Sequence, residues 1–311
     1  MTFPRLILMV LLGVECGFLV AQEPLTMISY NVENLFDCQH DTLKNDYSFL
    51  PDGDHHWTYH KYQTKLDRIA QVVVNISGWE SAALVGLCEV ENARCLRDLC
   101  YRLKRFHYQY VHYESEDERG IDVALLYDST KVKVLDSRPL RVDLNEDNTR
   151  DILYVKVLLH ERDTMYAMVC HLPSRLGGGA ATEWKRLQAK QVIQQQIDSI
   201  LHQQPQANIV VMGDMNDEAK NDLSGMSNQM VALEQAGQGT HKYQGVWSCL
   251  DQYYVSKELK DRVSVQIYSP EWLLEEDNKY LDYQPKRTFV GFRYHGGYSD
   301  HMPIVLTIYN K

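Results

Sequence analysis

Five short polar motifs stand at the ends of apolar runs in this chain. Asn31 and Glu89 each follow such a run, and Asp214 and Asn216 follow another. Carboxylate and amide oxygens are the ligands that hard divalent cations prefer in proteins. These residues, together with Asp300, could supply a metal site if the ends of their strands converge. The motifs are YNVEN at 30–34, CEVEN at 88–92, HLPSR at 171–175, GDMND at 213–217 and SDH at 299–301.

Two of these motifs also carry a histidine that could transfer protons. His171 opens HLPSR, and His301 closes SDH. Imidazole changes its charge near neutral pH, so a histidine beside a metal site is suited to accept a proton from water during hydrolysis. A single aspartate after a strand, however, more often only forms a turn. The chemical interpretation therefore depends on the elements that bring the motifs together.

Apolar runs of strand length alternate with turns along most of the chain. They are rich in β-branched and aromatic residues, and several lack alternation, which is typical of strands covered on both faces. Apolar stripes at helical spacing predict helices over 61–77 and 183–201. About ten strands with a few helices predict sheets packed face to face with helices outside. The predicted strands lie at 25–32, 83–90, 108–114, 121–128, 152–160, 165–172, 209–215, 249–256, 263–269 and 303–309.

Residues 1–21 have the character of a secretory signal peptide. A single arginine precedes an apolar run, and Ala21 is a small residue suited to cleavage. A membrane anchor is less consistent, because Glu15 interrupts a run already too short to span a bilayer comfortably. Cys16 leaves a lipoprotein as an alternative. We expect an exported protein, periplasmic or extracellular, without stable membrane insertion, in which residues 22–311 form one domain.

The cysteines after residue 21 would meet an oxidising compartment, which permits disulfides. Cys88, Cys170 and Cys249 nevertheless lie in apolar strand-like runs, where free buried thiols are expected. The sequence assigns no disulfide pairing.

The formal net charge of −10 argues against a protein that acts by coating nucleic acid. Such binding depends on cationic side chains that neutralise phosphates. The charge does not exclude a phosphodiester substrate, because a metal held by carboxylates inverts the local charge and attracts phosphate.

Seven motifs carry a resemblance to a known family. They are SYNVENLFD around Asn31, GLCEVEN around Glu89, RGIDVALLY around Asp122, CHLPSR around His171, GDMND with Asp214 and Asn216, SCLDQYYVS around Asp251, and SDH with Asp300 and His301. In this order they resemble the endonuclease/exonuclease/phosphatase superfamily, which includes pancreatic deoxyribonuclease, abasic-site exonucleases, neutral sphingomyelinases and inositol polyphosphate phosphatases. The resemblance covers essentially all of residues 25–309. It implies an α/β fold, a four-layered αββα sandwich of two mixed β-sheets flanked by helices, with a Mg²⁺-dependent site at one edge; Mn²⁺ or Ca²⁺ are alternatives.

The resemblance also implies a role for each motif. Glu89 would be the main metal ligand, with Asn31 and Asp300 beside it. His301 resembles the general base, with Asp251 orienting its ring. The other implied roles are positioning of the attacking water and phosphoryl oxygens by Asp214 and Asn216, and phosphate binding or proton donation by His171 with Asp122 as its partner.

Alternatives stay open for several residues. Arg119 and Arg175 could add bidentate contacts to phosphate, although Arg175 could equally belong to a surface loop. Asp122 could merely satisfy neighbouring backbone groups. Residues 52–60 resemble a second metal site, but a solvated loop is the more common state of such a stretch. The tryptophans that could stack on bases, or simply pack in the core, are Trp57, Trp247 and Trp272.

The expected reaction is in-line attack of water on phosphorus, with metal and fixed donors stabilising charge on the phosphoryl oxygens. We favour an exported Mg²⁺-dependent phosphodiester hydrolase, a monomeric nuclease that cleaves DNA or RNA. The same motifs would serve a phosphomonoesterase or a phospholipid phosphodiesterase. A binding protein that has lost catalysis fits less well, because Glu89, Asp214 and His301 are all present.

Overall fold

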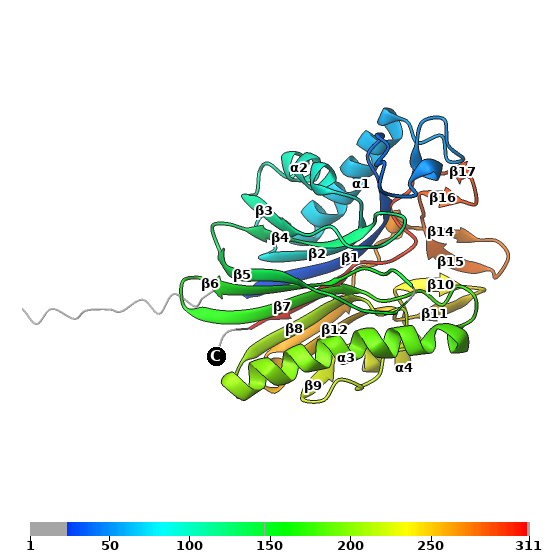
Figure 1. The fold of residues 1–311 in the computed structure, drawn as a ribbon. Helices are drawn as coiled ribbons and strands as arrows, with labels where there is room; N and C mark the ends of the chain where they lie inside the picture. The colour runs from blue at the N-terminus through cyan, green and yellow to red at the C-terminus, as the bar shows by residue number, and fades with distance from the viewer. Residues whose placement is uncertain (1–23, 146, 310–311) are drawn as a thin grey trace, which may run out of the picture.

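The computed structural model describes residues 24–145 and 147–309 and places two six-stranded mixed sheets face to face (Figure 1). The first sheet contains, in spatial order, β13 (Val263–Ile267), β18 (Ile304–Ile308), β1 (Leu25–Leu35), β2 (Leu84–Val90), β4 (Asp122–Asp128) and β3 (Tyr108–His112). The second contains β5 (Val132–Leu140), β6 (Ile152–Leu159), β7 (Asp163–His171), β8 (Asn208–Asp214), β12 (Asp251–Ser256) and β9 (Met226–Asn228). Strand β2 is parallel to β1, and β8 is parallel to β7.

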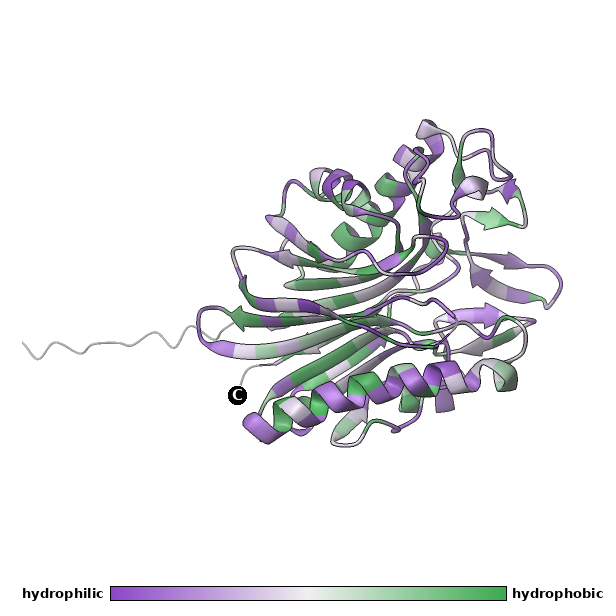
Figure 2. Cartoon of the chain, in the orientation of Figure 1, coloured by the Kyte–Doolittle hydropathy of each residue, from purple (hydrophilic) through white to green (hydrophobic). Residues whose placement is uncertain are grey.

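Helices form the two outer layers. Helices α1 (Tyr59–Ser77) and α2 (Ala93–Arg102) cover the first sheet, and α3 (Gly179–Gln203) runs along the second (Figure 1). Buried side chains form three apolar clusters, one under α1 and α2, one between the sheets and one under α3. Figure 2 shows the same alternation, with apolar strands inside and polar helix faces outside. The predicted αββα sandwich is therefore confirmed.

Three two-stranded hairpins lie at one end of the sandwich (Figure 1). Two of these hairpins lie within 270–299, where the sequence predicts no strand. The hairpins are β10 (His241–Tyr243) with β11 (Val246–Ser248), β14 (Leu274–Asp277) with β15 (Asp282–Pro285), and β16 (Phe289–Val290) with β17 (Arg293–Tyr294). The short helices are α4 (Val231–Gln235), α5 (Lys257–Lys260) and two 3-10 turns at Tyr47–Phe49 and Glu271–Leu273.

All ten predicted strands are present, and so are both predicted helices. One long strand, β5, was not predicted. Of its nine residues only Val132 is buried, and it pairs with β6 alone at the edge of the second sheet. An edge strand that buries so little has no apolar run for sequence reasoning to detect.

The described cysteines are all free thiols, and Cys88, Cys170 and Cys249 are buried as predicted. The predicted signal peptide and Cys16 lie outside the described residues. Within the described part of the chain, none of the helices has the length and apolar character needed to cross a bilayer.

Candidate active site

The ends of β1 and β2 bring Asn31 and Glu89 together. Strand pairing shifts register beside both residues, and Glu89 itself has a φ of 67° at a bulge. Bulges of this kind redirect a side chain out of the ladder. The Asn31 amide nitrogen donates to Glu89 Oε1 at 3.4 Å and to Asp214 Oδ2 at 3.1 Å. Side chains from both sheets therefore meet at one edge of the sandwich. The strand ends converge, which is the condition for these motifs to form one site.

Asp214 is the last residue of β8, and its position depends on how closely β8 lies against β7. At Gly213, φ is 137°, and an added Cβ would lie only 1.8 Å from the carbonyl oxygen of Cys170. Only glycine fits this position. The following turn is held by the backbone N–H of Asn216, which donates to Asp214 Oδ1 at 2.8 Å, and by the Asn216 amide, which donates to the Leu172 carbonyl at 3.0 Å.

His301 lies between two buried aspartates. Its Nδ1 is hydrogen-bonded to Asp251 Oδ2 at 2.7 Å, and its Nε2 lies 3.7 Å from Asp214 Oδ2. Ser299 fixes this motif to β1, because its hydroxyl donates to the Asn31 carbonyl and accepts the N–H of His301. Burial alone would lower the pKa of His301, but the carboxylates of Asp251 and Asp214 raise it well above its usual value. The ring is thus held and made strongly basic.

His171 approaches the same carboxylates from the other side. Its Nε2 lies 3.7 Å from Asp214 Oδ2 and 3.9 Å from Glu89 Oε1. Burial, and then the positive charges of Arg150, Arg119 and His301, lower the pKa of His171 well below its usual value. Asp214 therefore lies near one basic and one weakly basic imidazole. Burial raises the pKa of Asp214 to about 6, with the charge of Asp251 adding to the shift and His301 opposing it.

These groups face one open pocket of about 330 Å³. The residues that line it include Glu89, His171, Asp214, Asn216 and His301. The catalytic pocket, as we call this space, thus joins residues from the predicted motifs of both sheets.

The two arginines predicted to contact phosphate differ in position. Arg119 lines the catalytic pocket, its side chain is half exposed, and its Nε lies 3.9 Å from Asp117 Oδ1. Arg175 is instead bound within its own loop: its Nε donates to the Asn216 carbonyl at 3.0 Å and its Nη2 to Asp217 Oδ1 at 3.1 Å. Arg119 is free to contact a substrate, whereas Arg175 holds the turn after β8.

The expected pairing of Asp122 with His171 was wrong. Asp122 Oδ1 accepts the backbone N–H of Ser115, and its Oδ2 lies 3.6 Å from His112 Nε2. Nδ1 of His171 is buried and has no hydrogen-bond partner within residues 24–145 and 147–309. Strand β4 begins at Asp122 and turns this side chain toward β3, so Asp122 supports the wall behind the site.

Sequence analysis missed Arg150, which also lines the catalytic pocket. It is buried, and it donates to Asp117 Oδ2 and to the carbonyls of His171 and Leu172. Its position in a polar loop before β6 gives no sequence signal, because its partners include backbone oxygens from a distant strand end.

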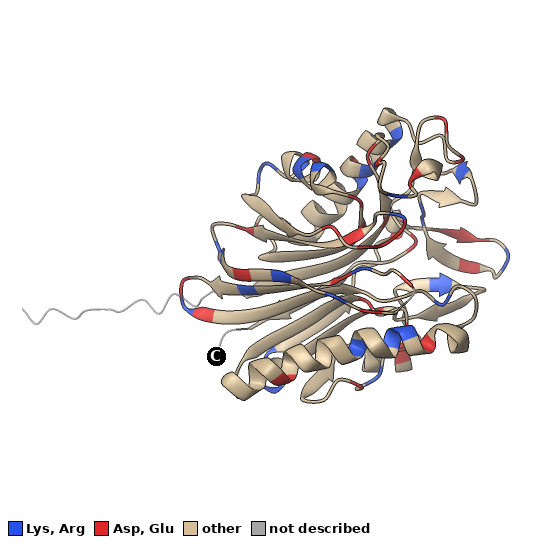
Figure 3. Ribbon diagram, in the orientation of Figure 1, with Lys and Arg blue, Asp and Glu red and all other residues tan. Residues whose placement is uncertain are grey.

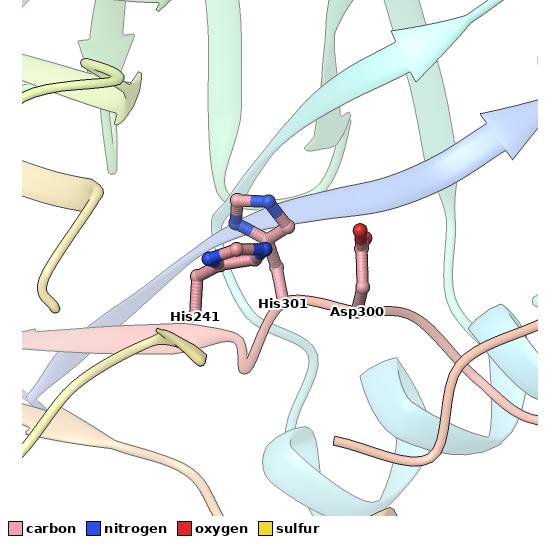
Figure 4. Close-up of side chains that lie close together, drawn as sticks. All are labelled: His241, Asp300 and His301. Atoms are coloured by element: carbon pink, nitrogen blue, oxygen red, sulfur yellow. The ribbon is translucent and has the colours of Figure 1, made fainter. Parts of the chain in front are cut away.

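Sequence analysis also missed His241, which begins β10 and lies beside His301 and Asp300 (Figure 4). The two imidazole centroids are 4.8 Å apart, and potential ligand atoms of all three residues lie within 4.8 Å of one another. Burial, followed by the charges of His301 and Arg287, lowers the pKa of His241 to about 4. Asp300 also forms an ion pair with Arg287, whose Nη2 lies 3.7 Å from Asp300 Oδ2.

The donor set fits a hard divalent cation. Glu89 and Asp214 are oxygen donors that line the catalytic pocket, and Asp300 lies in a group with His241 and His301. Carboxylates are the principal protein ligands of such ions. Burial is the main cause that raises the pKa of Asp214, and the charge of Asp251 adds to it, so a cation bound nearby would favour the ionised carboxylate. The Asn31 oxygen accepts the backbone N–H of Glu33, so this residue orients the carboxylates as well as offering a ligand atom.

The proposed second metal site at 52–60 is not assembled. His55 instead packs between Phe49 and Phe289, with ring centroids 4.5 Å from each. Trp57 is completely buried and donates to a backbone carbonyl, so it cannot stack on a base. Trp272 likewise packs against Tyr268 and Tyr298.

Comparisons with known proteins agree with this geometry. A family model described as the endonuclease/exonuclease/phosphatase family matches residues 26–310. No curated protein matches the chain. Solved structures of similar fold include TDP2 from Caenorhabditis elegans, with 16% identity, a TM-score of 0.61, and coverage of 93% of this chain and 75% of that one. An endonuclease/exonuclease/phosphatase from Bacteroides vulgatus has 17% identity, a TM-score of 0.57, and coverage of 93% and 100%. The human Nocturnin catalytic domain has 16% identity, a TM-score of 0.57, and coverage of 93% and 95%. At these identities the solved structures establish a shared fold.

Proposed function

The chain belongs to the endonuclease/exonuclease/phosphatase family and is a metal-dependent phosphoesterase, and on this basis we propose that it is a Mg²⁺-dependent nuclease acting on phosphodiester bonds in DNA or RNA. The observation that carries the proposal is the catalytic pocket, where Glu89, Asp214 and the two histidines converge from two sheets. A phosphodiester offers one anionic group and two ester oxygens, which matches a pocket with one half-exposed arginine and two imidazoles.

Each residue then has a definite task. A bound divalent cation would be held by Glu89, Asn31 and Asp300, and it would neutralise charge on the phosphoryl oxygens. His301, made basic by Asp251, accepts the proton of the attacking water. Asp214 and Asn216 orient that water and the phosphoryl group.

His171 and Arg119 act on the phosphate itself. The lowered pKa of His171 keeps its ring neutral at working pH, so it contacts a phosphoryl oxygen as a hydrogen-bond donor. Arg119 reaches the same pocket with its guanidinium, and among the described residues only Asp117 forms an ion pair with it, at 3.9 Å. Together they bind the anion without a dense cationic cluster.

Two solved relatives support a phosphate-bearing substrate. One structure is zebrafish TDP2 complexed with a single-strand DNA product, and the Nocturnin domain holds a bound sulfate anion. Lys and Arg are interspersed with Asp and Glu along this chain (Figure 3), so binding depends on the pocket rather than on a broad basic surface. We further propose export directed by residues 1–21, removal of that segment, and a monomeric mature protein.

Assays of the purified protein with Mg²⁺, Mn²⁺ or EDTA test this function. The substrates are plasmid DNA, RNA, bis-p-nitrophenyl phosphate, sphingomyelin and inositol phosphates. We expect metal-dependent cleavage of DNA or RNA. Cleavage of sphingomyelin or inositol phosphates alone would replace the nuclease with a phospholipid phosphodiesterase or a phosphomonoesterase. Absence of hydrolysis of every substrate would contradict the enzymatic proposal.

A further inference from the structure

A second open pocket, also about 330 Å³, adjoins the catalytic pocket. The two pockets share Arg119, Arg150, Ser174 and Leu176 in their walls. A ligand bound at Glu89 and Asp214 could therefore extend over Arg119 into the adjoining space. Each volume lies in the range of natural small-molecule sites.

The shared wall is a built structure. Arg150 is 8% exposed and ties three segments together, with bonds to Asp117, to the His171 carbonyl and to the Leu172 carbonyl. A buried arginine with three partners is held in one orientation. The second pocket therefore keeps a fixed position relative to the reacting phosphate.

Most charges in the second pocket neutralise one another. Arg150 pairs with Asp117 at 3.0 Å, and Lys185 pairs with Asp147 at 2.7 Å. Glu118 adds a further negative charge to the lining. Arg119, at the junction of the pockets, is the cation with the weakest pairing. The pocket therefore suits a neutral group attached to a single anionic phosphate.

The remaining lining is neutral and of mixed character. Leu144, Pro173 and the 88% exposed Leu176 supply apolar surface. Asn148 supplies an amide, and the hydroxyl of Thr149 is buried with no hydrogen-bond partner in the described chain. Of these two groups, the exposed Asn148 amide is the one that a ligand can reach, whereas the Thr149 hydroxyl is closed off from the surface.

We propose that this second pocket, which we call the nucleoside pocket, binds the base and sugar adjoining the scissile phosphate. A nucleoside has a flat apolar face and neutral hydrogen-bonding edges, and its phosphate would lie at Arg119. The proposal rests on the proposed nuclease function and deepens it, since it makes a nucleoside part of what the enzyme recognises.

The same lining disfavours two other phosphoesters. An inositol polyphosphate brings several anionic groups, and the paired Lys185 and Arg150 leave no cluster of free cations to meet them. A lipid acyl chain would bury the exposed Asn148 amide without a partner, which is costly.

The test compares p-nitrophenyl thymidine phosphates, both the 3′- and the 5′-ester, with methyl p-nitrophenyl phosphate. These substrates share the scissile phosphodiester and the coloured product, and they differ in the nucleoside. With Mg²⁺, we expect kcat/KM for the better thymidine ester to exceed that of the methyl ester at least about tenfold. Equal values would overturn the nucleoside pocket while leaving the phosphodiesterase intact.

A double variant assigns the preference to the pocket. Asn148→Ala with Thr149→Val removes two neutral hydrogen-bonding groups, and the latter preserves side-chain shape. We expect the ratio of the two kcat/KM values to fall toward one, through a higher KM for the thymidine ester. Asn75→Ala on α1, in the opposite helical layer, is the matched control and should keep the wild-type ratio. A double variant that also keeps it would overturn the assignment.

Binding separates failure of the pocket from failure of catalysis. If neither ester is hydrolysed, the proposed function fails, and calorimetry with thymidine 5′-monophosphate and methyl phosphate then decides the pocket. The nucleoside pocket is upheld if thymidine 5′-monophosphate binds more tightly than methyl phosphate and the double variant loses this difference. Equal affinities of the wild type for the two ligands would overturn it.

Discussion

The two histidines of the catalytic pocket show how neighbouring side chains decide what a residue can do. His301 has two carboxylates near its ring nitrogens, and they raise its pKa despite burial. His171 is equally buried but faces Arg150, Arg119 and His301, and its pKa falls. Groups whose pKa values are pushed apart in one pocket are suited to different steps of one reaction. We therefore assign proton acceptance to His301 and phosphate binding to His171.

Replacing His301 with alanine tests this assignment. We expect His301→Ala to lower kcat about 10²–10⁴-fold, because the general base is lost, while the circular dichroism spectrum stays unchanged. In the wild type, kcat/KM should rise with pH toward the alkaline range, since the base acts only after losing its proton. His202→Ala, in the last turn of α3, is the control. A near-normal rate for His301→Ala would remove this residue from the role.

The two arginines offer a paired comparison. Arg119→Ala should raise KM for a phosphodiester about tenfold, because it removes an available charged donor. Arg175→Ala should act mainly on stability, because its guanidinium holds Asn216 and Asp217. Steady-state kinetics measures the change in KM for both variants, and thermal denaturation measures the change in their stability. A larger KM effect from Arg175→Ala would reverse the roles drawn from the structure.

Single residues also mark how far sequence reasoning reaches. Glu89, Asp214 and His301 stand in recognisable motifs at strand ends, and the structure brings them into one pocket. Arg150 and His241 stand outside these motifs. Arg150 lies in the loop before β6 and His241 in the short strand β10, and only tertiary packing brings each to the site. Asp122 stands in a motif too, but its partner is set by which face of β4 it occupies.

At the scale of elements, the approach of β8 to β7 depends on Gly213. Gly213→Ala should destabilise the protein, because the new Cβ would collide with the Cys170 carbonyl. Gly237→Ala is the matched control, since Gly237 also has a positive φ of 78° but no atom within 4 Å of an added Cβ. We expect Gly213→Ala to cost about 1–3 kcal/mol more than the control in the free energy of unfolding. If urea denaturation shows that both variants lose the same free energy of unfolding, the collision at Gly213 is refuted.

The junction of β2 and α2 carries a buried acid, Glu91, which accepts the backbone N–H of Asp37. Burial, with the nearby charges of Asp37 and Asp46, raises the pKa of Glu91 from 4.5 to about 8. Between these values the unfolded chain releases the proton that the folded chain keeps. Raising the pH through this range therefore favours unfolding.

Glu91→Gln should remove this penalty while keeping an oxygen acceptor. In EDTA, we expect the variant to melt at least about 2 °C above the wild type at pH 8, and with little difference near pH 4. Calorimetry across this range checks the prediction. A difference in melting temperature that grows toward low pH would contradict the predicted direction of the pH dependence.

The strands and hairpins differ in how clearly the sequence predicts them. The central strands β1, β2 and β8 are buried on both faces, so their apolar runs predict them directly. Strand β5 and the hairpins β14–β15 and β16–β17 bury few side chains, although each strand pairs with a neighbour close by in the chain. They therefore lack the apolar runs by which a sequence predicts strands.

At the scale of the whole molecule, the sandwich places the ends of β1, β2, β7 and β8 at one edge. For a chain of net charge −10, the proposed phosphate binding requires a cation, and the carboxylates concentrated at this edge would recruit one. In the proposed function, the two sheets supply the ligands of the cation, and Arg119 at the margin of the site supplies a further contact to the anion.

Titration of Mg²⁺ against phosphodiester hydrolysis, for the wild type and Glu89→Gln, tests the central claim most directly. Glu89→Gln keeps the side-chain size and removes the charge that the cation requires. We predict that EDTA abolishes wild-type hydrolysis and that the Mg²⁺ midpoint of the variant rises at least about tenfold. Hydrolysis that persists in EDTA, or an unchanged midpoint in the variant, would contradict the account.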